Sequence, residues 1–348
     1  MSHLKKIGLF GMTTLLLVAC GTGNDTDSTG DNENTYSIAM VTDTGGVDDR
    51  SFNQSAWEGM QEWAEEHNYE DEQVIYYQSD SESDYKSNID NAVIDEHDII
   101  YGVGYLLEDP IEEAALQNPD QKFGIVDAEI DEDNVVSMGF ADHEAAFLAG
   151  VVAAKTTETD RLGFVGGFEG IIVDRFHTGF LDGVEYVDEN IDVDIQYVDS
   201  FSDAGAGQQT ASAMFSNDVD IIFHASGAAG NGVFQEARNR MEEDPSEDLW
   251  VIGVDSDQEE EGNWEGGNLT LTSTLKEVGQ AIKLTADEDL DDNFQGGRHV
   301  QYDLEDGGVN ITRGNISDDV WKETEEVKQL IIDGEIEVKE FTYSNVDD

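Results

Sequence analysis

From Tyr36 onward, short apolar runs alternate with segments in which apolar residues recur every three or four positions. The runs predict buried β-strands and the amphipathic segments predict helices. A first series has predicted strands 37–41, 73–77, 98–103, 122–126 and 135–140, with helices that include 53–67 and 85–96. A second series has strands 162–165, 193–198, 219–224 and 250–254, with helices 141–155, 175–187, 207–217 and 232–241. Near-continuous apolar strands that alternate with helices indicate parallel sheets covered on both faces, so the two series predict two α/β lobes.

Polar, aromatic or glycine-rich segments follow the predicted strands. The longest, residues 42–54, leads into a helix for which Ser51 is the expected N-cap. The others are Asp127, 199–203, 224–232 and 255–258. Because ligands of open α/β sheets bind beyond the carboxyl ends of the strands, we expect these segments to line a cleft between the lobes.

The first 20 residues are typical of a secretory signal. Lys5 and Lys6 precede an apolar run over 7–18, which is too short to span a membrane, and small residues follow it. Ala19, Cys20 and Gly21 resemble the bacterial lipobox, in which the cysteine is acylated and becomes the mature N-terminus. Cys20 is the only cysteine, so an internal disulfide is excluded and lipid attachment at Cys20 is expected. An ordinary signal peptide or a buried cysteine is the alternative.

Residues 21–35 consist of Gly, Thr, Asn, Asp and Ser with one Glu, a composition that cannot bury a core. We interpret this stretch as a flexible acidic linker between the lipid and the folded part. Residues 25–30 faintly resemble a calcium loop, but Thr29 and Tyr36 occupy two ligand positions, so no calcium site is expected.

The charge is extreme: 79 Asp and Glu against 17 Lys and Arg give a formal net charge of −62. A surface this negative repels phosphate backbones, which argues against a nucleic-acid partner. It also repels itself, and molar salt relieves that repulsion because the Debye length falls to about 3 Å. We interpret the composition as an adaptation to high salt, with an acidic protein of ordinary media as the alternative.

Motifs of catalysis are missing from the sequence. There is no G-x-S-x-G elbow, no H-E-x-x-H, no P-loop and no paired cysteine, and the glycines of 163–170 lack the spacing of a dinucleotide loop. Acidic pairs carry little information in so acidic a chain, so no metal site is expected. The sequence predicts a protein that is not an enzyme and uses no cofactor. A secreted hydrolase would need a nucleophile–base pair, and we find none.

Four segments together resemble a known family. They are VTDTGGVDDRSFNQSAWEG over 41–59, FHASGAAGNGVF over 223–234, IGVDSDQ over 252–258 and TSTLK over 272–276. They are similar to the basic membrane protein lipoproteins, also called the purine nucleoside receptor A family of substrate-binding proteins of ABC transporters. The likeness extends over essentially the whole chain after the linker, although the net charge departs from the word "basic".

The resemblance implies a type I periplasmic-binding-protein fold, with two doubly wound parallel-sheet lobes joined by a hinge of three crossovers. The N-terminal lobe would comprise 36–140, completed by about 277–305, and the C-terminal lobe 141–276, completed by about 306–348. The implied function is capture of nucleosides, chiefly purine nucleosides, by closure of the lobes and delivery to an ABC permease. The protein would be a monomer, lipid-anchored on the extracytoplasmic face of the cell membrane. A pentose or other small-molecule ligand, or a sensory or regulatory role without transport, is the alternative.

The resemblance also implies the roles of eight residues. Phe52 and Phe201 would stack on the two faces of the base, and Asp43 and Asn53 would read its edge. Asp127, Asp255 and Lys276 would hold the ribose hydroxyls, and Gly227 would let the backbone approach the ligand. Phe176, Phe234 and Arg175 fall near the site without an assigned role. Lys276 is expected to open a helix, where the helix dipole disfavours a cation, so a specific partner such as ribose hydroxyls or Asp255 is expected for it. A salt-bridging surface lysine is the alternative.

Overall fold

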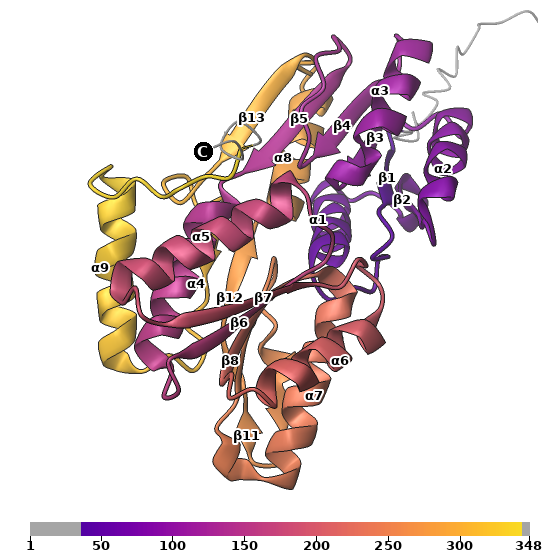
Figure 1. Cartoon of the computed structure of the whole chain (residues 1–348). Helices are drawn as coiled ribbons and strands as arrows, with labels where there is room; N and C mark the ends of the chain where they lie inside the picture. The colour runs from indigo at the N-terminus through magenta and orange to yellow at the C-terminus, as the bar shows by residue number, and fades with distance from the viewer. Residues whose placement is uncertain (1–35, 343–348) are drawn as a thin grey trace, which may run out of the picture. The chain divides into compact units, whose positions relative to one another are not determined.

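The computed structural model describes residues 36–342. The predicted signal, linker and lipid-attachment site at Cys20 lie outside this range. Two six-stranded sheets organise the described part, and each carries helices on both faces (Figure 1). This arrangement confirms the predicted fold class of two parallel-sheet α/β lobes.

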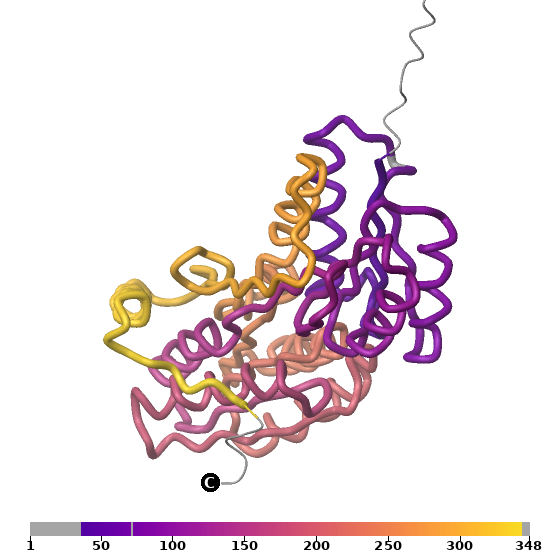
Figure 2. The backbone as a smooth tube through the Cα atoms, turned by 90° about the horizontal axis from the view of Figure 1, so that it is seen from above, coloured from indigo at the N-terminus to yellow at the C-terminus, as the bar shows by residue number. Residues whose placement is uncertain are grey.

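The first sheet has the strand order β13-β5-β4-β3-β1-β2, and all its strands run parallel. Its strands are β1 (Ile38–Thr42), β2 (Val74–Tyr77), β3 (Ile99–Val103), β4 (Lys122–Val126), β5 (Val135–Phe140) and β13 (Arg298–Tyr302). Helices α1 (Phe52–His67) and α8 (Val278–Leu290) lie side by side on one face, as Figure 2 shows from above. Helices α2 (Glu82–Ile94) and α3 (Glu108–Gln117) cover the other face. Because both faces are covered, β1 and β3 are buried at every position, which explains their unbroken apolar sequences.

The second sheet has the order β14-β12-β9-β8-β6-β7, in which only β14 is antiparallel to its neighbour. Its strands are β6 (Arg161–Gly166), β7 (Asp192–Tyr197), β8 (Ile221–Ala225), β9 (Trp250–Gly253), β12 (Thr270–Lys276) and β14 (Val309–Ile311). Helices α4 (Asp142–Thr156) and α5 (Ile171–Val187) pack together on one face, and α9 (Asp318–Ile332) packs on α4. Helices α6 (Ala204–Phe215) and α7 (Gly230–Glu243) cover the other face. A short hairpin, β10 (Asn263–Trp264) and β11 (Gly267–Asn268), follows β9.

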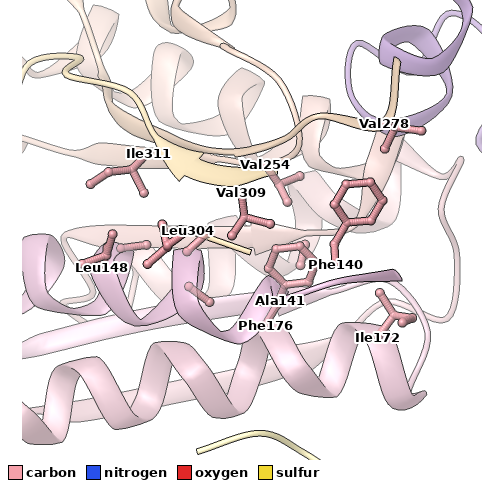
Figure 3. Packing of buried hydrophobic residues seen from close by; sticks show 14 of the residues in the cluster. Phe140, Ala141, Leu148, Ile172, Phe176, Val254, Val278, Leu304, Val309 and Ile311 are labelled. Atoms are coloured by element: carbon pink, nitrogen blue, oxygen red, sulfur yellow. The ribbon is translucent and has the colours of Figure 1, made fainter. Parts of the chain in front are cut away.

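Within residues 36–342 the chain passes between the two sheets three times: from β5 to α4, from β12 to α8, and from β13 to β14. Backbone hydrogen bonds join these segments. Ala141 N donates to Tyr302 O over 2.8 Å, and Glu277 N donates to Gly308 O over 2.9 Å. Leu304 of the third crossing lies with Leu148 of α4 and Val309 of β14 in the apolar core beside them (Figure 3). The crossings therefore form one hydrogen-bonded hinge.

The predicted strands and helices are present, with ends displaced by a few residues. Sequence reasoning missed the strands β10, β11, β12, β13 and β14 and the helices α3 and α9. The predicted start of one helix was wrong: Lys276 does not open a helix but closes β12, and α8 begins two residues later. Among the helices of the described part, none is long and apolar enough to cross a membrane.

Candidate functional site

A cavity lies where the strand ends of the two sheets meet, and both sheets contribute residues to it. All eight residues to which the resemblance assigned a role line it: Asp43, Phe52, Asn53, Asp127, Phe201, Gly227, Asp255 and Lys276. The cavity is also lined by Gly45, Asp49, Gly104, Tyr105, Ile172, Val173, Phe176, Ala225 and Val254. Residues up to 233 positions apart in the sequence, from 43 to 276, thus meet at one place, while their roles in binding stay predictions.

Asn53 holds two carboxylates together at one end of the cavity. Its Nδ2 donates to Asp43 Oδ1 over 2.7 Å and to Asp49 Oδ2 over 2.9 Å, and its Oδ1 accepts a bond from Asp43 N over 3.3 Å. Gly45 N also donates to Asp43 Oδ1, over 2.8 Å. Both amide hydrogens of Asn53 are therefore already engaged by carboxylates. Burial raises the pKa of Asp43 to about 7, and it also raises the pKa of Asp49.

Ser51 occupies the N-cap position of α1, but its side chain does not cap the helix. Asp49 does so instead, because its carboxylate accepts from Asn53 N over 2.9 Å and from Gln54 N over 3.1 Å, next to the positive end of the helix. The hydroxyl of Ser51 donates to Asp255 Oδ2 over 2.6 Å. The predicted N-cap position of Ser51 is confirmed, but its hydroxyl links the two lobes and does not bond to the helix end.

Lys276 lies in a cage of carboxylates. Its Nζ lies 2.7 Å from Asp127 Oδ2 and 3.1 and 3.2 Å from the two oxygens of Asp142. Burial by itself lowers the pKa of Lys276, but the carboxylates of Asp127, Asp142 and Asp255 outweigh burial and raise it. With 2% of its side chain exposed, Lys276 is not the surface lysine of the alternative interpretation.

The neighbouring carboxyl groups respond to the same burial. Burial raises the pKa of Asp142 to about 7 and that of Asp255 to about 6, while Lys276 opposes both shifts. Asp127 Oδ1 is buried and has no hydrogen-bond partner within residues 36–342. A buried acceptor of this kind is costly unless a donor reaches it, and Asp127 is one of the residues that line the cavity.

Asp127 and Asp255 occupy equivalent places in the two lobes. Asp127 directly follows β4, and Asp255 follows β9 by two residues. Both have left-handed backbone, with φ of 67° and 65°. This conformation is uncommon for residues other than glycine, and aspartate tolerates it better than most. The chain thus turns sharply at both strand ends, and both carboxylates border one cavity.

Each lobe contributes an aromatic ring. Phe52 begins α1 on the first lobe, and Lys276 Nζ lies 5.2 Å from its ring centroid. Phe201, from the loop after β7, lies directly over Gly167, where an added methyl group would lie 2.2 Å from the ring. Tyr105 contacts Phe201 edge to face, with the ring centroids 6.4 Å apart.

The three residues that the sequence placed near the site without an assigned role lie in different surroundings. Phe176 lines the cavity, and Lys276 Nζ lies 5.6 Å from its ring centroid. Phe234 is fully buried and packs edge to face on His224, so it is a core residue. Arg175 forms an ion pair with Glu340, 2.9 Å apart.

Sequence reasoning did not single out four residues that line the cavity or contact Lys276. Asp49 lies inside the long motif over 41–59, and Tyr105 follows β3 at the carboxyl edge of the sheet, so strand-end position was a usable signal for both. No sequence signal pointed to Asp142 or Ile172. Asp142 is one of 79 acidic residues, and an isoleucine at position 172 is typical of a core residue.

Two α/β lobes, a hydrogen-bonded hinge and a cavity lined by aromatic rings and carboxylates define a two-lobed small-molecule binding protein. Within the described residues, no group of three or more His, Cys, Asp and Glu side chains is arranged to hold a metal ion.

Comparisons with known proteins agree with this class. The family model for PnrA-like substrate-binding proteins of ABC transporters matches residues 36–342. The chain is 48% identical over 338 residues to the "CD4+ T-cell-stimulating antigen" of Listeria innocua, covering 94% of this chain and 95% of that protein. It is 41% identical over 331 residues to the "ABC transporter nucleoside-binding protein BmpA" of Lactococcus lactis, covering 93% and 94%. A solved ABC-transporter solute-binding protein from Aeropyrum pernix is similar with a TM-score of 0.79 and 27% identity, covering 90% and 95%. The chain therefore belongs to the PnrA-like family of ABC transporter substrate-binding proteins, which confirms the resemblance found in the sequence.

Proposed function

We propose that this protein captures purine nucleosides outside the cell and delivers them to an ABC permease. The observation that carries the proposal is that two aromatic rings, Phe52 and Phe201, come from opposite lobes to the same cavity as the polar group of Asp127, Asp255 and Lys276. A purine nucleoside offers two π faces at one end and vicinal hydroxyls at the other. Stacking of a base on an aromatic side chain contributes about 1–3 kcal/mol. The Lactococcus lactis relative, named as a nucleoside-binding protein, supports the same ligand class.

In this proposal each part of the cavity has one task. Phe52 and Phe201 enclose the base, and closure of the lobes brings them together. The buried acceptor Asp127 Oδ1 and the carboxylate of Asp255 accept hydrogen bonds from the ribose hydroxyls, and Lys276 balances their charge. Asp43 reads the edge of the base. Asn53 acts through Asp43, because both its amide hydrogens already bind carboxylates.

The charge of the cavity favours a neutral ligand. Asp43, Asp49, Asp127, Asp142 and Asp255 are all at most 9% exposed, and Lys276 is the cation among them. A phosphate group would add negative charge beside these carboxylates, which repel it at short range. We therefore expect nucleosides to bind and nucleoside monophosphates not to bind.

Calorimetric titration of the purified protein in molar salt against nucleosides, free bases and pentoses tests this function. Binding of inosine, guanosine or adenosine without binding of free ribose is the expected result. Binding of a pentose with no heat from any purine nucleoside would overturn the proposal in favour of the sugar alternative. Binding of inosine monophosphate as tight as that of inosine would contradict the charge argument.

We further propose that Cys20 carries the lipid, that residues 21–35 tether a monomeric binding protein to the extracytoplasmic face of the membrane, and that the acidic surface suits it to brine. In the same proposal, residues 36–140 with about 277–305 close as one lobe on 141–276 with about 306–348. Fractionation of cells that express Cys20→Ser tests the anchor. Release of this variant into the medium is the expected result, and its retention in the membrane would refute lipid attachment at Cys20.

A further inference from the structure

The loop between β1 and α1, residues 43–51, belongs to the first lobe but is bonded to the second. Arg50 makes most of these contacts. Its backbone oxygen accepts hydrogen bonds from Gln258 Nε2 over 2.9 Å and from Ser256 Oγ over 3.1 Å. The guanidinium group of Arg50 forms an ion pair with Glu261. Asn231 Nδ2 donates to the backbone oxygen of Asp49 over 3.3 Å. The second lobe therefore holds both the backbone and the side chain of this loop.

Gln258 is fixed in the orientation that this contact requires. Its Oε1 accepts from Val254 N and from His224 Nε2, each over 2.9 Å, so its Nε2 points to Arg50 O. Burial lowers the pKa of His224 to about 4, so the ring is neutral and donates through Nε2. Gln258 is itself 2% exposed. Gln258 Nε2 is therefore a buried donor of the second lobe, held in place by its neighbours and directed at the carbonyl group of Arg50 in the first lobe.

Arg50 also has an uncommon backbone conformation. Its φ of 60° lies in the left-handed region, which costs free energy for a residue other than glycine. In this structure the strained residue is the one whose carbonyl group receives both donors from the second lobe. The contact therefore joins the second lobe to a strained residue of the first.

The loop contributes residues to the cavity and is followed by another cavity residue. Asp43 and Asp49 line it, Ser51 binds the cavity residue Asp255, and the next residue, Phe52, is one of the two enclosing rings. The second-lobe partners Ser256, Gln258 and Glu261 do not line the cavity. They contact the loop beside the cavity.

We propose that Ser256, Gln258 and Glu261 form a latch on Arg50 that stabilises the closed state and slows release of the ligand. They are positioning residues, since they act through the loop that carries Asp43, Asp49 and Phe52. A contact made only in the closed state shifts the equilibrium between open and closed forms by its own free energy. The ligand leaves through the open form, so loss of the latch should raise the dissociation rate. The inference rests on the proposed function for its choice of ligand.

Dissociation of radiolabelled inosine from the full-length chain, chased with unlabelled inosine, tests the latch. The variants to compare are Arg50→Gln, Glu261→Gln, the two combined, and Glu261→Gln with Ser256→Ala. The salt concentration is the lowest at which the wild type stays folded. Loss of the partly exposed ion pair should speed dissociation about two- to fivefold. Further loss of the Ser256 hydrogen bond should bring the increase to about tenfold. Arg50→Gln combined with Glu261→Gln should be no faster than either alone, because both remove one interaction.

Glu288→Gln is the matched control, since it breaks the ion pair with Arg298, 2.9 Å apart, inside the first lobe. It should leave the dissociation rate unchanged. Unaltered dissociation in all the latch variants, or an equal increase in Glu288→Gln, would overturn the inference.

A ligand-free measurement separates the latch from the proposed function. If the wild type binds no nucleoside, the proposed function is wrong, and deuterium uptake by residues 43–51 of the unliganded protein then decides about the latch. Faster uptake in Glu261→Gln with Ser256→Ala than in the wild type and in Glu288→Gln supports the latch. Equal uptake in all three proteins overturns it.

Discussion

Lys276 and Asp142 form a buried ion pair that joins two of the three segments of the hinge, with Nζ 3.1 and 3.2 Å from the carboxylate oxygens. Lys276 ends β12 at the second crossing, and Asp142 opens α4 at the first. The same ammonium group lies 2.7 Å from Asp127, which lines the cavity. One lysine thus connects the hinge with the candidate binding site.

Replacing Lys276 by methionine should destabilise the protein strongly. Removal of one partner of a buried ion pair costs about 3–5 kcal/mol because it leaves charge without compensation. Burial raises the pKa of Asp142 to about 7 and that of Asp255 to about 6, so both carboxyl groups are largely protonated at pH 5 and less charge is left without compensation. The loss should therefore be smaller at pH 5 than at pH 8. Denaturant unfolding of wild type and variant at the two pH values measures both effects.

Lys283→Met is the control for this change. Lys283 pairs at the surface with Glu62 and Glu66, whose side chains are 68% and 58% exposed. Its replacement should cost at most about 1 kcal/mol at either pH. A loss in Lys276→Met that is no larger than this, or that grows on acidification, would contradict the role of Lys276 as the counter-charge.

Asp43→Asn should change how stability depends on pH. Burial raises the pKa of Asp43 to about 7 from an ordinary value of 3.8. Between these values the folded state keeps a proton that the unfolded state has lost, so rising pH lowers the free energy of unfolding. Asparagine cannot ionise and keeps an oxygen for the bonds from Asn53 and Gly45. The free energy of unfolding of the variant, relative to wild type, should therefore increase as the pH rises from about 4 to about 7.

Denaturant titrations at several pH values in constant molar salt measure this difference. Comparison with Asp248→Asn, which changes an exposed residue, removes the contribution of the surface acids. A difference between Asp43→Asn and wild type that is constant with pH would show that Asp43 titrates normally.

Much of the fold follows from local patterns. Strands such as β1 and β4 are apolar runs bounded by polar turns, and that pattern is visible in the chain. The later elements were missed because their patterns are weaker. β13, at the edge of its sheet, has no fully buried residue, and β14 has only three residues. Their pairing with β5 and β12 depends on tertiary contacts far along the chain.

The cavity residues could be predicted from the motif and from the rule that ligands bind at strand ends. The pairing of Lys276 with Asp142 could not, because Asp142 is 134 positions away and no local pattern relates the two residues. Ser51 illustrates a further limit. Its sequence position is typical of an N-cap, but the carboxylate of Asp49 accepts the hydrogen bond from the first turn of the helix. Only the tertiary structure brings Asp255 to the hydroxyl of Ser51.

Phe52→Leu should weaken nucleoside binding by about 1–3 kcal/mol, since leucine keeps apolar volume but offers no π face to a base. Calorimetric titration with inosine measures the change. Phe234→Leu is the matched control, because Phe234 is a buried core ring that does not line the cavity. It should lower the melting temperature and leave the affinity unchanged. Equal affinity of wild type and Phe52→Leu would place this ring outside the binding site.

The net charge of −62 predicts that salt stabilises the protein. Added KCl screens the repulsion between surface carboxylates, and most of the effect should be complete near about 1 M, where the Debye length is about 3 Å. Thermal unfolding at increasing KCl should show a midpoint that rises and then levels off. A midpoint that stays flat or falls between low salt and about 1 M would contradict the interpretation as a high-salt protein.

Gly167→Ala should weaken nucleoside binding through Phe201. The added methyl group would lie 2.2 Å from Phe201 Cε1, a contact that forces the ring to move. Because Phe201 is one of the two rings proposed to enclose the base, its displacement should lower the affinity for inosine about as much as loss of a stacking ring, by about 1–3 kcal/mol. Gly205→Ala is the control: it lies in α6, where only Asp203 Oδ1 comes within 4 Å of the added methyl group, and alanine favours the helix. Calorimetric titration should show unchanged binding for Gly205→Ala, and unchanged binding for Gly167→Ala as well would separate Phe201 from the ligand.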